Sequence, residues 1–185
     1  MNGRTAAIVL AAGGGSRFAD GQKLLAPFRG RALVTWAAEA AEEAALDETI
    51  VVVGDTLLTD VLPGSVTVVP NPDWERGIAT SLWAGLREAA GFDAVVVGLA
   101  DQPLIPSSAW SALAAAAKSA VAVATYGGRR RNPVRLARSV WPLLPTTGDE
   151  GARALMRDHP DLVMEVPCAG DPADVDTVSD LRALS

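Results

Sequence analysis

Short, continuous apolar segments alternate along the chain with segments of helical periodicity. The clearest apolar segments are Thr5 to Leu10 (TAAIVL), Thr49 to Val53 (TIVVV) and Ala94 to Leu99 (AVVVGL). Strands that are apolar on both faces are typical of a parallel sheet with helices on both sides. The order therefore predicts an α/β fold with three layers, a Rossmann-like, mostly parallel sheet between helices. In such sheets, ligands bind beyond the carboxyl ends of the strands.

Weaker patterns complete the predicted order of elements. Further strands are expected at Val66 to Val69, Ala120 to Thr125, Asn132 to Leu136 and Leu162 to Val166. Helices are expected at Ala32 to Ala45, Thr56 to Leu62, Gly77 to Ala90, Ser107 to Ser119, Arg138 to Leu144, Glu150 to Asp158 and Val178 to Leu184. Ser107 and Ser108 are expected to cap the helix that follows them. Because 49% of the 185 residues are hydrophobic, we expect residues 1–185 to form one domain with a full core.

The charge and the rare residue types narrow the classes of function. The formal net charge is −6, which argues against binding to nucleic acid or to an anionic membrane. The N-terminal apolar run is too short for a membrane span and lacks the form of a secretory signal, so we expect a cytoplasmic protein. Cys168 is the only cysteine, so no internal disulfide or thiolate metal cluster can form. His159 ends a predicted helix, and we expect no catalytic pair of these two residues.

A glycine-rich loop follows the first predicted strand, within Leu10 to Lys23 (LAAGGGSRFADGQK). It lacks the G-x-x-x-x-G-K-[ST] order of a Walker A loop and the G-x-G-x-x-G order of a dinucleotide-binding loop. Its consecutive glycines still let backbone N–H groups approach phosphate oxygens without obstruction by a Cβ atom. Arg17 can clamp a phosphate with two hydrogen bonds, and Lys23 can add a point charge. The loop suits a polyphosphate, and a tight turn with a solvated arginine is the alternative.

The same stretch resembles the signature of the MobA-like nucleotidyltransferases, L-A-[AG]-G-x-S-x-R-[FM]-G followed by K-L-L, and is most similar to the molybdenum cofactor cytidylyltransferase branch. Further family motifs occur in order along the chain: Asn71-Pro72, Trp74, Gly77, Ser81, Asp101-Gln102-Pro103, Gly128, Asn132-Pro133-Val134, Gly148-Asp149, Gly151-Ala152-Arg153 and Asp174 to Thr177. The sequence departs from the family at Ala100, which is usually glycine, and at Ala19-Asp20-Gly21, which lengthens the segment before Lys23. The resemblance implies the fold of the nucleotide-diphospho-sugar transferase type.

The resemblance also implies roles for particular residues. Those expected to bind the nucleotide are Leu10, Ala11, Ala12, Gly13, Gly14, Gly15, Ser16, Arg17, Lys23, Gly77 and Ser81. Those expected to act in catalysis are Arg17, Lys23 and Asp101, and those expected at the acceptor are Arg131, Asn132, Gly148 and Asp149.

Two carboxylates are expected to hold the metal ion. Asp101 follows the carboxyl end of a predicted strand, and Mg²⁺ prefers oxygen ligands; a turn or capping aspartate is the alternative. Asp176 resembles the family's second metal ligand. Asp174 stays an alternative, because an extended segment would point both side chains to one face.

The activity that the resemblance implies is Mg²⁺-dependent transfer of CMP from CTP to the phosphate of molybdopterin, with release of pyrophosphate. Such an acceptor is already an anion near neutral pH, so no histidine base is needed. CTP is favoured over GTP because cytidylyl members resemble LAAG at Ala11 and Ala12, whereas guanylyl members tend to carry LAGG. A molybdenum hydroxylase apoenzyme or its chaperone would receive the product. The open alternatives are GTP, another acceptor such as a sugar phosphate or phospholactate, and a noncatalytic nucleotide sensor or cofactor chaperone.

A dense basic patch is expected to face the anionic acceptor, and a solvated basic hairpin is the alternative. Its residues are Arg129, Arg130, Arg131, Arg135 and Arg138. The five tryptophans are expected in the core or at its rim rather than stacked on a ligand, and Trp74 is the one to test for a ligand contact.

Overall fold

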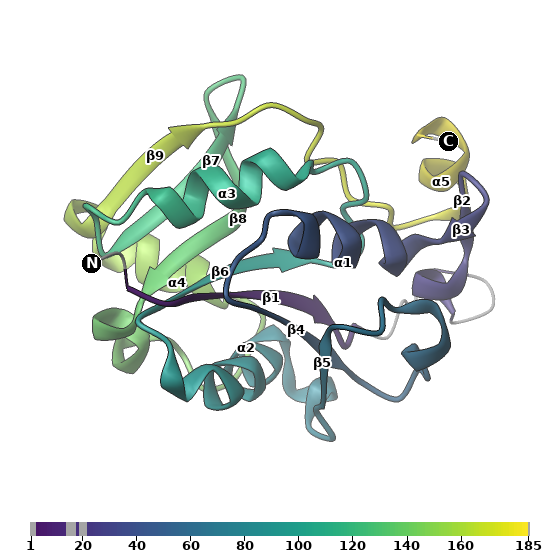
Figure 1. Cartoon of the computed structure of the whole chain (residues 1–185), viewed down its shortest axis with the longest axis horizontal. Coiled ribbons are helices and arrows are strands. Elements are labelled where there is room, and N and C mark those ends of the chain that lie inside the picture. The colour runs from purple at the N-terminus through teal and green to yellow at the C-terminus, as the bar shows by residue number, and fades with distance from the viewer. Residues whose placement is uncertain (1–2, 14–17, 19–21, 185) are drawn as a thin grey trace.

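A seven-stranded sheet with helices on both faces forms the centre of the molecule (Figure 1). The structure is a computed structural model that describes residues 3–13, 18 and 22–184. The strand order across the sheet is β5-β4-β1-β6-β8-β7-β9. The strands are β1 (Thr5–Ala11), β4 (Glu48–Val53), β5 (Thr67–Pro70), β6 (Ala94–Leu99), β7 (Val121–Tyr126), β8 (Arg129–Ala137) and β9 (Val163–Pro167).

All neighbouring strands in this sheet are parallel except where β8 takes part. β8 runs antiparallel to both β6 and β7, because a tight turn at Gly127 and Gly128, both with positive φ, reverses the chain. The predicted mostly parallel α/β fold is therefore confirmed. No helix in the described part of the chain is both long and apolar enough to cross a membrane.

The helices cover the two faces of the sheet, as the alternating apolar strands predict. Figure 1 places α1 (Leu33–Glu43) and α3 (Ser107–Ala115) on one face, with α2 (Ile78–Glu88) and α4 (Ala152–Asp158) on the other. Along β1, Ala7 and Val9 pack in the core under α1 and α3. Ile8 and Leu10 pack in the core with α2 and α4. The central strand is thus buried on both sides.

Two glycines allow close packing of helices on the sheet. A Cβ atom on Gly85 of α2 would lie 2.8 Å from Ile8 Cγ2, so the helix can lie directly against β1. A Cβ atom on Gly98 of β6 would lie 2.5 Å from Trp110 Cη2. The largest fully buried side chain, Trp110 of α3, therefore fits only because residue 98 has no side chain.

Some local predictions are wrong. The segment Thr56 to Leu62 forms only a 3₁₀ turn, Thr59–Val61, and the segment Arg138–Leu143 is 3₁₀ rather than α, with Pro142 inside it. Helix α3 is capped at Pro106 with no side-chain hydrogen bond, because the serines lie inside its first turn. A short hairpin that the sequence did not predict is formed by β2 (Pro27–Phe28) and β3 (Arg31–Ala32). The helix α5 (Val178–Leu184) agrees with its predicted bounds.

Candidate active site

The carboxyl ends of β1 and β6 meet at one edge of the sheet. The two strands are parallel neighbours, with Leu10 opposite Leu99. Beyond them, the Ala100 N–H donates to the Leu10 carbonyl at 3.1 Å. The residue after Ala100, Asp101, therefore lies beside the start of the glycine-rich loop, at the edge where parallel sheets bind ligands.

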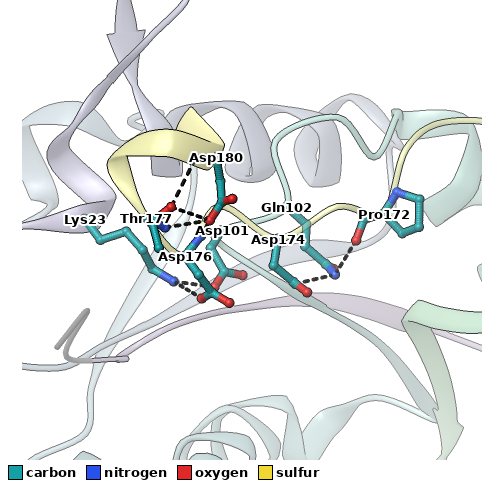
Figure 2. Close-up of polar contacts among 8 residues, drawn as sticks. All are labelled: Lys23, Asp101, Gln102, Pro172, Asp174, Asp176, Thr177 and Asp180. Atoms are coloured by element: carbon teal, nitrogen blue, oxygen red, sulfur yellow. Dashed lines mark hydrogen bonds and ion pairs between the residues drawn. The ribbon is translucent and has the colours of Figure 1, made fainter. Parts of the chain in front are cut away.

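Lys23 reaches this edge from a short 3₁₀ turn, Lys23–Leu25. Leu24 is buried in the core and anchors the turn. Lys23 Nζ donates to Asp101 Oδ2 at 2.7 Å and to Asp176 Oδ1 at 3.3 Å (Figure 2). Burial by itself lowers the pKa of Lys23, but Asp101 and Asp176 outweigh it and raise the pKa above its ordinary value. The ammonium is therefore charged at neutral pH.

Asp101 and Gln102 hold the segment that precedes α5. The Val175 N–H donates to the Asp101 carbonyl at 2.9 Å. The buried Gln102 amide donates to the Pro172 carbonyl at 3.0 Å and to Asp174 Oδ1 at 2.8 Å. These contacts bring residues from the end of the chain to the end of β6.

A reciprocal cap fixes the start of α5. The Thr177 N–H donates to Asp180 Oδ2 at 2.8 Å, and the Asp180 N–H donates to Thr177 Oγ1 at 3.1 Å. The Asp176 N–H also donates to Asp180 Oδ2, at 3.2 Å. Such a capping box orders the residue before the helix as well as its first turn.

The two aspartates that the sequence could not distinguish have different partners. Figure 2 shows Asp176 beside Lys23 and Asp174 beside Gln102. Burial, and then the charge of Asp101, raises the pKa of Asp174. Asp176 is thus the carboxylate that shares a cation with Asp101.

The pair Asp101 and Asp176 fits a divalent ion. Asp101 Oδ1 is buried and has no hydrogen-bond partner among the residues that the structure describes. Within residues 3–13, 18 and 22–184, no group of three or more Asp, Glu, His or Cys side chains could hold a metal ion. Mg²⁺ is commonly held by one or two carboxylates together with waters and phosphate oxygens. Two carboxylates, one with an unused oxygen, match that pattern.

A cavity of about 330 Å³ adjoins this cluster. It is lined by residues that the sequence analysis assigned to the nucleotide or to catalysis: Leu10, Ala11, Ala12, Gly13, Lys23, Gly77, Ser81 and Asp101. Trp74, the tryptophan singled out for a test of ligand contact, also lines it. Gly14, Gly15, Ser16 and Arg17 lie outside the described residues, so their roles stay predictions.

Asn71 links the end of β5 to the wall of this first cavity. Its side-chain amide is buried and donates to Thr80 Oγ1 at 3.0 Å and to Ser81 Oγ at 2.9 Å. Its Oδ1 atom accepts from the Asp73 N–H at 3.1 Å. Asn71 was expected only as part of a motif, although an asparagine directly after a strand is a signal for such a link.

Gly77 lets the loop at residues 148–149 cover the start of α2. Its φ is +108°, and a Cβ atom there would lie 2.5 Å from the Gly148 carbonyl. The Ala79 N–H donates to the Gly148 carbonyl at 3.0 Å, and the Ile78 N–H donates to Asp149 Oδ1 at 3.3 Å. Asp149, expected at the acceptor, therefore lines the first cavity.

A second cavity, of about 420 Å³, lies on the other side of Leu99, which lines both. Arg131 and Asn132, also expected at the acceptor, line this second cavity rather than the first. Its other lining residues are Gln102, Val123, Arg130, Val134, Arg153, Met156, Arg157 and Asp174. The cavity thus combines an apolar floor with several arginines. It also contains Gln102 and Asp174, which form a hydrogen bond with each other.

The prediction of a single basic patch is wrong. Arg135 is buried and donates to the Ser119 carbonyl at 3.0 Å, and burial lowers its pKa. Arg138 donates to the Phe92 carbonyl and lies over the Trp141 ring. The register of β8 on β7 shifts between Val123 and Ala124, which pair with Val134 and Arg131. Arg135 is buried on one side of this shift, while Arg130 and Arg131 line the second cavity on the other, so the run of arginines does not make one surface.

The chain is similar to a known protein family and to curated proteins. Residues 7–163 match the MobA-like NTP transferase domain. Nicotine blue oxidoreductase of Paenarthrobacter nicotinovorans is 31% identical, over 96% of this chain and 94% of that protein. Molybdenum cofactor guanylyltransferase of Cereibacter sphaeroides is 33% identical, over 74% of this chain and 68% of that protein.

Solved structures resemble the whole chain. The Rv0371c protein of Mycobacterium tuberculosis superposes with a TM-score of 0.87 at 27% identity, covering 100% of this chain and 98% of that one. A second structure of that protein, a complex with manganese, gives a TM-score of 0.85 at 25% identity, with the same coverage.

Proposed function

The chain belongs to the MobA-like NTP transferase family, and on this premise we propose that it transfers CMP from CTP to the phosphate of a molybdopterin-type acceptor. The reaction uses Mg²⁺ and releases pyrophosphate, and a molybdenum hydroxylase apoenzyme or its chaperone receives the product. The observation that carries the proposal is the cluster of Lys23, Asp101 and Asp176 beside the first cavity.

The chemistry requires neutralisation of charge more than proton transfer. An acceptor phosphate oxygen bonds to the α-phosphorus of CTP, and the bond from that phosphorus to pyrophosphate breaks. Both reactants are anions. Lys23 supplies a positive charge, and Asp101 and Asp176 would hold the divalent ion, which neutralises phosphate charge when bound. A phosphomonoester has its second pKa at about 6 and needs no base, and His159 lines neither cavity.

The donor set supports Mg²⁺ as the divalent ion. Carboxylate oxygens with phosphate oxygens and waters are the ligands that Mg²⁺ prefers. The manganese complex of the Mycobacterium tuberculosis protein supports a divalent ion in a protein of this fold. Mn²⁺ and Mg²⁺ both accept such oxygen ligands, so manganese is also a suitable probe.

The choice of CTP rests on Ala11 and Ala12, which line the first cavity. GTP is the competing nucleotide, because the Cereibacter relative is named a guanylyltransferase. Replacing Ala12→Gly should shift the ratio of CTP to GTP use, and an unchanged ratio would argue against a base contact at this position.

We assign the acceptor to the second cavity, because it adjoins the cluster through Leu99 and Gln102. Its apolar floor, including Met156, suits a flat ring system, and Arg131 and Arg153 suit a phosphate. Asp174 and Gln102 add oxygen acceptors for ring N–H groups. A sugar phosphate would leave the apolar floor without a partner.

A direct assay tests the proposal. Purified protein is incubated with Mg²⁺, molybdopterin and CTP labelled at its α-phosphate. The proposal predicts a labelled dinucleotide and an equal amount of pyrophosphate. Nucleotide binding with no pyrophosphate release would favour a noncatalytic sensor instead, and a labelled product from GTP alone would overturn the choice of CTP.

A redox reaction is the second candidate, because the relative that covers 96% of the chain is named an oxidoreductase. The glycine-rich loop lacks the dinucleotide-binding order, which disfavours this candidate. Reduction of nicotine blue, with a reduced nicotinamide nucleotide as the probe, would support it, and label transfer without such reduction would exclude it.

A further inference from the structure

The ammonium of Lys23 lies where a metal ion would be expected. It contacts Asp101 Oδ2 and Asp176 Oδ1, the two carboxylate oxygens that converge (Figure 2). The Lys23 side chain is only 11% exposed. An ion that bound these two oxygens would occupy the place of the ammonium.

We propose that Lys23 is a resident counterion of the carboxylate pair, and that it must leave Asp101 and Asp176 before a divalent ion can bind both. The assignment of the metal pair rests on the proposed function. The exchange itself is a separate claim about Lys23.

Charge gives the reason for the resident cation. Two carboxylates that converge repel each other unless a positive charge lies between them. Lys23 supplies that charge and keeps Asp101 and Asp176 together when no metal ion is bound. The same contact opposes binding of a divalent ion, because two cations would compete for the same oxygens.

The turn that carries Lys23 limits where the displaced ammonium can go. Leu24 holds the backbone in the core, so only the flexible lysine side chain can move far. Gly13 and Lys23 line the same cavity, which means the displaced ammonium stays near the glycine-rich loop. When the metal ion binds, the displaced Lys23 ammonium would therefore lie against the bound phosphates. The metal ion and the nucleotide would then bind with positive cooperativity.

The test measures binding of Mn²⁺ alone, without nucleotide or acceptor. Free Mn²⁺ is followed by electron paramagnetic resonance during titration of wild type, Lys23→Met and Lys118→Met. Lys118 is exposed and is the only other lysine, so it is the matched control. We expect Lys23→Met to bind Mn²⁺ about 10-fold more tightly or better, equivalent to ~1.4 kcal/mol, and Lys118→Met to match the wild type. Equal or weaker binding by Lys23→Met would overturn the exchange.

A second measurement uses the wild-type protein and so does not depend on the stability of a variant. With lysine labelled at ¹³Cε, Lys23 and Lys118 give two side-chain signals. Addition of Mg²⁺ should shift the Lys23 signal and leave that of Lys118 unchanged. If Mg²⁺ binds and the Lys23 signal stays in place, Lys23 does not exchange. Neither experiment includes nucleotide transfer, so failure of the proposed activity would leave these results interpretable.

Discussion

Lys23 Nζ donates a 2.7 Å hydrogen bond to Asp101 Oδ2, although 78 residues separate the two in the chain. The contact exists because β1 and β6 are parallel neighbours, so the segments that follow them meet at one edge of the sheet. The loop after β1 therefore contributes a cation to the site, and the loop after β6 contributes a carboxylate.

Replacing Asp101→Asn should reduce nucleotide transfer by about 10²–10³-fold. The amide lacks the negative charge of the carboxylate and is a weaker ligand for a divalent ion. Steady-state assays with saturating Mg²⁺ would measure the effect. Asp60→Asn, at an exposed position in a surface turn, is the matched control and should keep wild-type activity. Full activity in Asp101→Asn would remove this carboxylate from the mechanism.

Gly85→Ala should destabilise the fold through the contact between α2 and β1. The new methyl group would lie 2.8 Å from Ile8 Cγ2, and such overpacking costs about 1–3 kcal/mol. The gain in helix propensity, roughly 0.5–1 kcal/mol, is smaller. Urea unfolding would measure the difference. Gly64→Ala, which meets nothing within 4 Å, should be nearly neutral, and similar midpoints for both variants would contradict this packing.

Gly77→Ala should displace the loop at residues 148–149 and weaken nucleotide binding by about 10-fold or more, because the first cavity loses part of its wall. Gly148→Ala is the informative comparison: its φ is also positive, at +88°, but a Cβ atom there meets nothing within 4 Å. It should bring only backbone strain of about 1–3 kcal/mol. Nucleotide titration and urea unfolding together separate the two effects, and equal losses of affinity would argue against the clash.

Tyr126, the only tyrosine, should make the stability of the fold depend on pH in the alkaline range. Burial, with a contribution from Cys168, raises its pKa well above the ordinary value. The folded state then keeps the phenol proton when the unfolded state releases it, so stability should fall as the pH rises above about 10.

Absorbance of the phenolate at 295 nm would follow this transition. In the folded protein the signal should stay low above pH ~10 and appear together with unfolding. Tyr126→Phe should lose this contribution to the pH dependence and match the wild type at neutral pH, because the buried hydroxyl has no partner among the described residues. An ordinary titration in the folded state would contradict the prediction.

The parts of the fold that the sequence predicted well are those with strong periodic signals. Continuous apolar runs predicted β1, β4 and β6, and Asp101, the second residue beyond the end of β6, was then expected at the site from the general rule for parallel sheets. Short elements were missed, because the two-residue strands β2 and β3 leave no periodic pattern.

At the site, the sequence did not predict the directions in which the side chains point. The run of arginines in β8 indicated one patch, but β8 sends Arg135 into the core and Arg131 to the second cavity. Spacing alone could not distinguish Asp174 from Asp176. Their partners depend on Gln102 and Lys23, which are distant in sequence.

The central claim is that the first cavity binds a nucleoside triphosphate with a divalent ion, and thermal unfolding with each of the four nucleoside triphosphates and Mg²⁺ tests it most directly. A ligand at 100 times its Kd adds about 2.7 kcal/mol, which raises Tm by roughly 5–10 °C in a protein of this size. We predict a rise of this size with CTP, and a much smaller one in the Asp101→Asn variant. No rise with any of the four would contradict the account.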